Sequence, residues 1–358
     1  MESKQRYKVI GLMSGTSLDG LDIAACTIEH AAKGWTFKIH HAATIRYAPS
    51  WVKKLAGAHL LPSGTLIETD IRYGKLIGSA VVKFMNEKRF RPDFISSHGH
   101  TVFHQPSKGF TYQIGNGNAI HAVTGVPVVC DFRSMDVLRG GEGAPLVPAG
   151  DKFLFSEYDI CLNLGGIANL SMEFNRERVA FDVCFANMAL NYLAMKAGKK
   201  FDPNGQLAGA GEVNRILLRK LNALYKAFRH KRPSLGREIF EEKIRPLLDD
   251  EAVPLRDRLA TLTESAAQEI VRAIPANKKI RKVLCTGGGA FNSFLISKIL
   301  ELGGDRLTLI LPDEDIVKFK EAVVFAFLGV LRVRDEVNCL KSVTGATRDS
   351  SAGVLVGF

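Results

Sequence analysis

Three glycine-rich segments of this chain contain residues that could bind phosphate. The first, GLMSGTSLDG, joins two apolar runs that are typical of strands, so it predicts a hairpin rather than a strand-to-helix phosphate loop. Such a hairpin can present backbone N–H groups and hydroxyls to phosphate oxygens. An Asp-Gly pair is also common in ordinary hairpin turns, so the segment alone fits either a phosphate-binding turn or a plain hairpin turn. Its candidate phosphate ligands are Gly11, Ser14, Gly15, Thr16 and Ser17.

The other two segments extend this pattern into the second half of the chain. NLGGIANLS contains Gly165 and Gly166 between two strand-like runs, at the place that matches the first hairpin. CTGGGAFNSFL follows a strand and opens a helix, whose N-terminus favours an anionic or polar group. A glycine triplet there also occurs as a plain tight turn, but three such turns in this order predict a clamp on a triphosphate. The glycines of the third turn are Gly287, Gly288 and Gly289.

Four carboxylates are candidates for chemistry. Asp19 and Asp22 lie close enough in the first turn to hold a metal ion, directly or through water. Asp182 ends the apolar run VAFDVC, where a charge is costly unless it is paired or used. It could be a general base or a carboxylate at the start of the next helix. Glu321 is predicted in the first turn of the last helix, where an acidic residue complements the helix dipole and needs no chemical role.

The histidines of SSHGHTVFHQP are a further polar group. His98, His100 and His104 lack the spacing of a zinc site, and no cysteine or carboxylate joins them locally. We expect them to line a polar cleft or to bind substrate rather than to hold a metal.

Composition excludes several classes of protein. Of the 358 residues 46% are hydrophobic and 24% are charged, as in globular proteins, and the length favours two domains. The formal charge of +11 comes from scattered basic residues without interleaved aromatics, so we expect a solvated surface and no nucleic-acid partner. Six cysteines without CxxC spacing predict reduced core thiols and a cytoplasmic location. No apolar run reaches 18 residues, so neither secretion nor membrane spanning is indicated.

The order of predicted elements repeats along the chain. Strands at 7–13, 21–28 and 35–45 precede a helix at 75–88; strands at 158–164, 170–174 and 178–184 precede a helix at 188–196. This repetition suggests an internal duplication into two α/β lobes with a central cleft, the usual place for a small-molecule site. We place the first lobe at 1–130, with a contribution from 340–358, and the second at 131–339. A polar loop is expected after the strand at 93–97, and the last helix at 320–332.

Eight segments resemble, in order, those of the anhydro-N-acetylmuramic acid kinases. They are GLMSGTSLDGLDIA, SHGHTVFHQP, QIGNGNAI, VVCDFRSMDVLRGGEGAPLVP, LNLGGIANLS, PSLGREIF, CTGGGAFNSFL and SVTGAT. The resemblance implies the fold of the sugar kinase, Hsp70 and actin superfamily, with two ribonuclease-H-like lobes and ATP and Mg²⁺ in the cleft. It also implies peptidoglycan recycling. In members of that family a carboxylate base activates water to open a 1,6-anhydrosugar while O6 takes the γ-phosphoryl group, giving N-acetylmuramic acid 6-phosphate. A homodimer is implied as well.

The resemblance also implies roles for individual residues. Asp182 matches the family's catalytic base, and Glu321 matches a carboxylate near the sugar. The first turn, from Gly11 to Asp19, would hold the ATP phosphates and Mg²⁺, with Asp19 as the metal ligand. Gly165 and Gly166 would hold the opposite side of the phosphates, and Gly287 to Gly289 the adenosine. The sugar side would be lined by His98, Arg133 and the segment from Glu142 to Pro145, with Asn187 kept beside the base.

Three departures from the family pattern bear on specificity. Cys184-Phe185-Ala186 replaces Gly-Pro-Gly, and His100 and Glu142 each replace a glutamine. Phe185 adds bulk where glycine permits close approach, so we expect a reshaped pocket and a shifted sugar preference. A kinase for another anhydrosugar or amino sugar, or a nucleotide-dependent regulatory protein without turnover, are the alternative functions.

Overall fold

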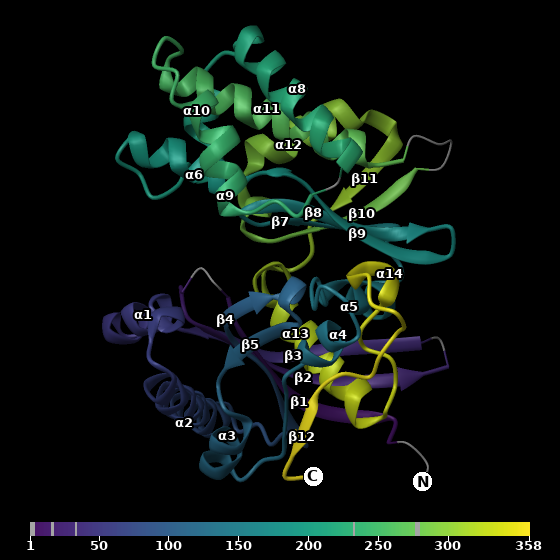
Figure 1. Cartoon of the computed structure of the whole chain (residues 1–358). Coiled ribbons are helices and arrows are strands. Elements are labelled where there is room, and N and C mark those ends of the chain that lie inside the picture. The colour runs from purple at the N-terminus through teal and green to yellow at the C-terminus, as the bar shows by residue number, and fades with distance from the viewer. Residues whose placement is uncertain (1–3, 16–17, 33, 232, 276–279) are drawn as a thin grey trace. The chain divides into compact units, whose positions relative to one another are not determined.

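The chain forms two compact units in a computed structural model that describes residues 4–15, 18–32, 34–231, 233–275 and 280–358 (Figure 1). Unit 1 contains Met1–Ser156 and Phe319–Phe358, and unit 2 contains Glu157–Lys318. These divisions differ from the predicted ones at 130/131 and 339/340. The reason is that helix α5 (Val147–Leu154) packs against strand β3 of unit 1, and that most of helix α13 (Glu314–Val333) belongs to the same unit.

Unit 1 is built on one mixed sheet. Its strands β1, β2 and β3 form an antiparallel meander, β4 is parallel to β1, and β6 is parallel to β4. The C-terminal strand β12 adds to β6, so the end of the chain completes this sheet, and β5 pairs with β4. The strands are β1 (Arg6–Ser14), β2 (Leu21–Ala31), β3 (Gly34–Ile45), β4 (Phe94–Gln105), β5 (Phe110–Ile114), β6 (Val128–Cys130) and β12 (Val354–Val356).

Unit 2 repeats the same topology. Strands β7, β8 and β9 form the antiparallel meander, β10 is parallel to β7, and β11 is parallel to β10. Three antiparallel strands followed by parallel ones, in matching order in both sheets, make each unit ribonuclease-H-like. The predicted fold and the predicted repeat of the strand order are therefore confirmed. The strands are β7 (Ile160–Leu164), β8 (Ile167–Phe174), β9 (Glu177–Phe185), β10 (Arg281–Thr286) and β11 (Leu307–Ile310).

Helices cover each sheet with the faces that the sequence predicts. In unit 1, α2 (Ser63–Lys88) buries Tyr73, Ile77 and Val81 at four-residue spacing, and α3 (Gly117–Thr124) lies beside it (Figure 1). In unit 2, α11 (Leu255–Ala273) buries a similar stripe against the core. Further helices are α4 (Ser134–Leu138), α6 (Asn187–Lys196), α8 (Arg215–Lys231), α9 (Arg237–Ile239), α10 (Arg245–Leu248), α12 (Ser293–Gly303) and α14 (Lys341–Thr344).

Three predicted elements have different bounds in the structure. The expected polar loop after residue 97 is strand instead, because β5 folds back and supplies hydrogen-bond partners to β4 as far as Gln105. Helix α2 begins at Ser63 rather than near residue 75. Helix α13 begins at Glu314, six residues before the predicted start. This last difference changes the interpretation of Glu321.

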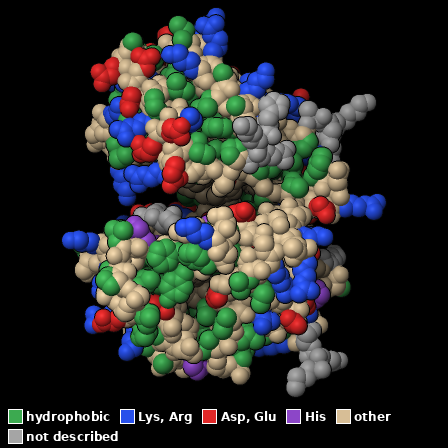
Figure 2. Space-filling view, viewed as in Figure 1, with side chains coloured by type: hydrophobic (Ala, Val, Ile, Leu, Met, Phe, Trp, Pro, Cys, Tyr) green, Lys and Arg blue, Asp and Glu red, His purple; other side chains and the backbone are tan. Residues whose placement is uncertain are grey.

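The surface and the thiols agree with the composition. On the face shown in Figure 2, Lys and Arg side chains alternate with Asp and Glu and do not form one basic field. Of the helices in the described part of the chain, none has the length and apolar character needed to cross a bilayer. All six cysteines are free; five are buried and Cys130 is partly exposed.

Candidate active site

The first glycine segment connects β1 to β2 as a hairpin, as the sequence predicts. Ser14 ends β1 with a buried side chain, and its Oγ accepts a 2.8 Å hydrogen bond from the hydroxyl of Tyr47. The same Oγ lies 3.2 Å from Nδ1 of His100, and the Tyr47 hydroxyl lies 2.6 Å from that of Tyr73. Residues from β4, α2 and the connection between β3 and α1 therefore hold the Ser14 hydroxyl in place. Thr16 and Ser17 lie outside the described residues.

Gly11 lies inside β1 rather than in the turn. A Cβ at this position would stand 2.9 Å from Cβ of Ala326 and would overlap the carbonyl oxygen of Ala322, both on α13. The glycine therefore has a packing reason, because it lets the helix backbone rest directly on the strand. This contact places the N-terminal half of α13, with Glu321, against the strand that leads into the first turn.

Glu321 stands in the second turn of α13, seven residues after the helix begins. Glu314 and Asp315 occupy the first turn and already complement the dipole, so the simple explanation for an acidic residue at 321 does not apply. Its side chain reaches solvent, yet the surrounding protein displaces enough water to raise the pKa of the carboxyl, while Arg133 and Lys320 oppose the shift. Glu321 therefore has no capping role, and its charge interacts with that of Arg133.

The acidic residues of the first turn lie at the same end of β1 and β2. Oδ1 of Asp22 accepts a 2.5 Å hydrogen bond from Thr44, and burial, with a smaller effect of the Asp19 charge, raises the pKa of Asp22. Asp19 is exposed. Within the described ranges no group of three or more His, Cys, Asp or Glu side chains is arranged around a metal. The set suits Mg²⁺, which keeps several waters and takes one or two carboxylates, better than a cation that needs a full protein cage.

His98 and Arg133 form one polar group in unit 1. The Arg133 Nε donates to Nε2 of His98 at 2.9 Å, and Nδ1 of His98 lies 2.9 Å from the carbonyl oxygen of Gly99. The ring is therefore neutral with its proton on Nδ1, and burial together with the Arg133 charge holds its pKa well below the ordinary value. Nη1 of Arg133 donates to the carbonyl oxygen of Gly143 at 2.6 Å. These contacts fix the plane of the guanidinium.

The buried carboxylate of Asp136 holds the loop that contains Glu142. Oδ2 of Asp136 accepts from the Gly143 N–H, and Oδ1 accepts from the Thr344 hydroxyl, both at 2.8 Å. The Glu142 N–H donates to the Thr344 carbonyl at 2.8 Å, while the Glu142 side chain is exposed. Asp136 was not among the predicted site residues. Its signal was a lone acidic residue in the apolar run SMDVL, directly before the glycine loop.

In unit 2 the second and third glycine turns lie against each other. A Cβ on Gly287 would stand 2.5 Å from Oδ1 of Asn163, and one on Gly289 would stand 2.7 Å from Cβ of Leu164. Asn187 joins the same place, since its Nδ2 donates to the Leu164 carbonyl at 3.1 Å. Two of the three glycines in the third turn are thus required for this close packing.

The remaining glycines of these turns are not crowded by protein. A Cβ on Gly165, Gly166 or Gly288 would find its nearest neighbour at 3.4 Å, 3.6 Å and 3.7 Å respectively, which is ordinary contact. Packing therefore does not require glycine at these positions, although the carbonyl oxygens of Gly165 and Gly166 accept hydrogen bonds from the N–H groups of residues 186–188. The third turn does not open a helix directly, because a 3₁₀ turn at Gly288–Phe291 precedes α12, whose start is capped by the side chain of Asn292.

Asp182 lies within β9, where it pairs with Asn169 of β8. The helix that follows begins at Asn187, so Asp182 is not the helix N-terminal carboxylate that was the alternative explanation. Its Oδ2 accepts a 2.8 Å hydrogen bond from the Leu235 N–H. Burial raises the pKa of the carboxyl above its ordinary value of 3.8, and the Leu235 contact partly opposes this. A half-buried carboxylate with a raised pKa suits a general base.

Comparison with known proteins identifies the family of the chain. The profile of the family described as anhydro-N-acetylmuramic acid kinase matches residues 7–357. The chain belongs to this family. It is 35% identical to the anhydro-N-acetylmuramic acid kinase of Sulfurimonas denitrificans, over 97% of this chain and 98% of the relative. It is 33% identical to the enzyme of that name from Vibrio parahaemolyticus, over 97% of each chain. The family is one of phosphotransferases, and its role is kinase activity in cell-wall recycling.

Cys184-Phe185-Ala186 stands where the anhydro-N-acetylmuramic acid kinase family pattern has Gly-Pro-Gly, and the structure shows where these side chains lie. Phe185 is fully buried in the core of unit 2, where its ring lies 5.7 Å from that of Phe240 and its N–H donates to the Tyr225 hydroxyl. The Cys184 thiol is also buried, 3.8 Å from the Ala266 carbonyl. The expected reshaping of a pocket by Phe185 is therefore wrong, because this ring and the Cys184 thiol are both fully buried in the core of unit 2.

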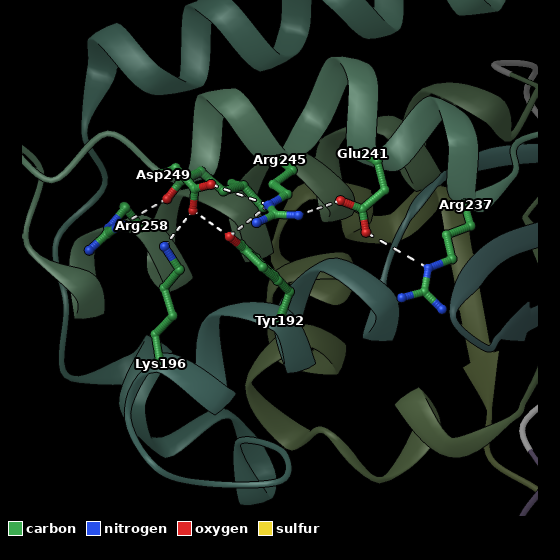
Figure 3. A network of polar contacts seen from close by, with 8 residues as sticks. Tyr192, Lys196, Arg237, Glu241, Arg245, Asp249 and Arg258 are labelled. Carbon is green, nitrogen blue, oxygen red and sulfur yellow. Dashed lines mark hydrogen bonds and ion pairs between the residues drawn. The ribbon is translucent and has the colours of Figure 1, made fainter.

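A polar network keeps the partner of Phe185 in place. Phe240 begins the π-helical turn Phe240–Ile244, and the segment around it is tied to α6 by Asp249, which lies among Tyr192, Lys196 and Arg245 (Figure 3). The Tyr192 hydroxyl donates to Asp249 at 2.5 Å. The network lies near the surface and anchors this part of unit 2.

Proposed function

We propose that this protein is an ATP-dependent kinase that opens 1,6-anhydro-N-acetylmuramic acid with water and phosphorylates O6. The product would be N-acetylmuramic acid 6-phosphate. The single observation that carries the proposal is Asp182, a half-buried carboxylate with a raised pKa that has no capping role, in a chain of this family. We propose the cytoplasm as its location and a homodimer as its assembly.

The proposed reaction needs a base because neutral water attacks the anomeric carbon poorly. Asp182 would take a proton from the water as its oxygen bonds to C1. The C1–O6 bond breaks and its electron pair stays on O6, which attacks the γ-phosphorus of ATP while ADP leaves. One water, one sugar and one ATP thus give the sugar phosphate, ADP and one proton, which Asp182 releases to solvent after the transfer. Burial raises the pKa of Asp182 and so makes it a stronger base than an exposed aspartate.

The polar group of unit 1 would bind the sugar. Arg133 is held rigidly by His98 and by the loop at Gly143, and its charge faces Glu321. A fixed guanidinium beside a carboxylate can orient hydroxyl and carboxylate groups of a sugar acid through charged hydrogen bonds. His98, whose Nε2 accepts from Arg133, would act as a positioning residue.

The glycine turns would bind the nucleotide. Gly165, Gly166 and Gly288 have no packing reason to be glycine, and Ser14 offers a hydroxyl that its neighbours hold in place. Asp19 would be the protein ligand of Mg²⁺, with water completing the shell. When bound, that ion would neutralise charge on the phosphates during transfer.

A coupled ADP-release assay tests the proposal. 1,6-Anhydro-N-acetylmuramic acid should release ADP far faster than unbridged N-acetylmuramic acid or an anhydrohexose without the lactyl group. In water enriched in ¹⁸O, mass analysis should find one label in each product molecule, at C1. Release of ADP without label in the sugar phosphate would mean simple phosphorylation, and release that does not depend on sugar would contradict the kinase assignment.

A further inference from the structure

The segment of unit 2 that contacts Asp182 is built from short helical pieces. From Leu235 the chain runs through α9, the π-helical turn Phe240–Ile244 and α10 to Asp249. Helices of three to five residues do not form on their own in water, because too few hydrogen bonds offset the cost of ordering the backbone. The position of the Leu235 N–H on Asp182 therefore depends on the contacts that hold this segment from outside.

Apolar packing holds the middle of the segment against β9 and α6. The ring of Phe240 lies 5.7 Å from that of Phe185, the last residue of β9, and 5.6 Å from that of Tyr192 on α6. Both phenylalanines are buried. Phe185 is one of the three residues that stand where the family pattern has Gly-Pro-Gly, and neither glycine nor proline could supply this ring. The contact is thus a feature of this chain.

Polar contacts hold the far end of the segment on the same helix. Oδ1 of Asp249 accepts a 2.5 Å hydrogen bond from the Tyr192 hydroxyl and pairs with Lys196, both on α6 (Figure 3). Oδ2 of Asp249 lies 3.4 Å from Nε of Arg245. The side chains of Asp249 and Lys196 are 35% and 32% exposed, and ion pairs with this exposure add little to global stability. Their effect is local, because they join the end of the segment to α6.

These contacts close a loop that begins and ends at the candidate base. From Asp182 the chain leads along β9 into α6, which begins at Asn187. The Tyr192 hydroxyl joins α6 to Asp249, and the segment then leads back to Leu235 and its contact with Asp182. Strand β9 is paired with β8 along its whole length, so this side of the loop is fixed. The segment is the side that can shift.

We propose that Asp249 and Tyr192 are positioning residues for the base, and that they act on Asp182 through the Leu235 N–H. They hold the far end of the segment on α6 and so keep this N–H on Oδ2 of Asp182. The bond orients the carboxylate and stabilises its charged form. This assignment rests on the proposed function, since it names residues that support the base of that reaction.

The test compares Asp249→Ala with the matched control Asp250→Ala, which removes the same charge from the next residue. Among the described residues, the Asp250 carboxylate contacts Lys220 at 4.0 Å and the Ala252 N–H at 3.2 Å, and neither lies on α6. With 1,6-anhydro-N-acetylmuramic acid, kcat of Asp249→Ala should fall about three- to tenfold, the usual size of one hydrogen bond, while KM for sugar and ATP changes little. Asp250→Ala should keep the wild-type kcat.

A pH profile and hydrogen exchange separate positioning from a loss of stability. Burial raises the pKa of Asp182, and the Leu235 N–H partly opposes this by bonding to the charged form. When Asp249→Ala loosens that bond, the acidic limb of kcat/KM should move to higher pH, and the Leu235 amide should exchange faster. Neither change should occur in Asp250→Ala. Tyr192→Phe keeps the aromatic ring and should show both changes in weaker form.

The possible outcomes are distinct. A lower melting temperature of Asp249→Ala with an unmoved acidic limb and unchanged Leu235 exchange would make the network purely structural and overturn the inference. Equal effects in Asp249→Ala and Asp250→Ala would overturn it as well, because the loss would then follow from charge alone. If Asp249→Ala does not fold, Tyr192→Phe decides by the same two readouts. A wild type that turns over no anhydrosugar would overturn the proposed function, whereas faster Leu235 exchange in Asp249→Ala would still support the link to Asp182.

Discussion

The backbone N–H of Leu235 donates a 2.8 Å hydrogen bond to Oδ2 of Asp182, across 53 residues of sequence. The contact ties the segment PSLG to the strand that carries the candidate base. It fixes one carboxylate oxygen and, among the described residues, leaves the other without a direct hydrogen bond. A base needs this combination, because the carboxylate must be oriented and must still accept a proton.

Replacing Asp182 by Asn should abolish turnover while nucleotide binding persists. We expect kcat on the anhydrosugar to fall about a thousandfold or more, since an amide cannot accept the proton of the attacking water. ATP affinity, measured by calorimetry, should stay within about threefold of the wild type. Near-wild-type rates for this variant would exclude Asp182 as the base.

The raised pKa of Asp182 predicts the acidic side of the pH profile. The ionised form is the active one, so kcat/KM should fall as pH falls through the folded-state pKa, with a midpoint above 3.8. Glu321→Gln tests whether the other raised carboxyl contributes to the same limb. A midpoint at or below 3.8 in both proteins would contradict the role of burial.

The same pKa shift predicts a stability effect of opposite sign. A carboxyl whose pKa is raised by folding favours the native state below its unfolded pKa, and this contribution is lost as pH rises through the folded pKa. Asp182→Asn should therefore melt at or above the wild-type temperature at pH 7, and the difference should shrink by pH 4. Thermal scans at both values decide this, and a variant less stable at pH 7 would argue against it.

Arg133→Lys should weaken sugar binding more than catalysis. A lysine cannot contact both His98 and the Gly143 carbonyl, as the guanidinium does. We expect KM for the sugar to rise about tenfold or more, with a smaller change in kcat and none in KM for ATP. Arg139→Lys, just after the same short helix, is the control and should behave as the wild type.

Gly11→Ala should destabilise unit 1 through packing. The added Cβ would overlap the Ala322 carbonyl, so strand and helix must separate, at a cost of about 1–3 kcal/mol in the free energy of unfolding. Gly64→Ala in α2 is the matched control, because no atom lies within 4 Å of its added Cβ. Urea unfolding that shows equal stability for the two variants would refute the packing role of Gly11.

Asp19→Asn should raise the Mg²⁺ concentration needed for half-maximal activity by about tenfold, with KM for the sugar unchanged. Loss of one of the few carboxylates available to the ion weakens its binding. Asp22→Asn should have the smaller effect, because Thr44 already occupies one oxygen of Asp22. A Mg²⁺ titration of both variants that showed the reverse order would make Asp22 the ligand.

Much of the site could be predicted because its residues lie in short motifs. The hairpin with Ser14, the Gly165-Gly166 turn and the strand that carries Asp182 were placed correctly, since the period of apolar residues reports local structure. Asp136 was missed because its partners are Gly143 and the distant Thr344, and only its position in the run SMDVL, just before the loop at Gly143, hinted at them.

By itself, the amino-acid sequence determined the repeated strand order, the family and the candidate carboxylates, because these depend on local spacing. The tertiary structure alone decided that Gly11 serves helix packing, that Glu321 is no helix cap and that Phe185 turns into the core. It also revealed the Leu235 contact to Asp182 and the polar network around Asp249. Each of these depends on which distant atoms come into contact, and local periodicity carries no information about that.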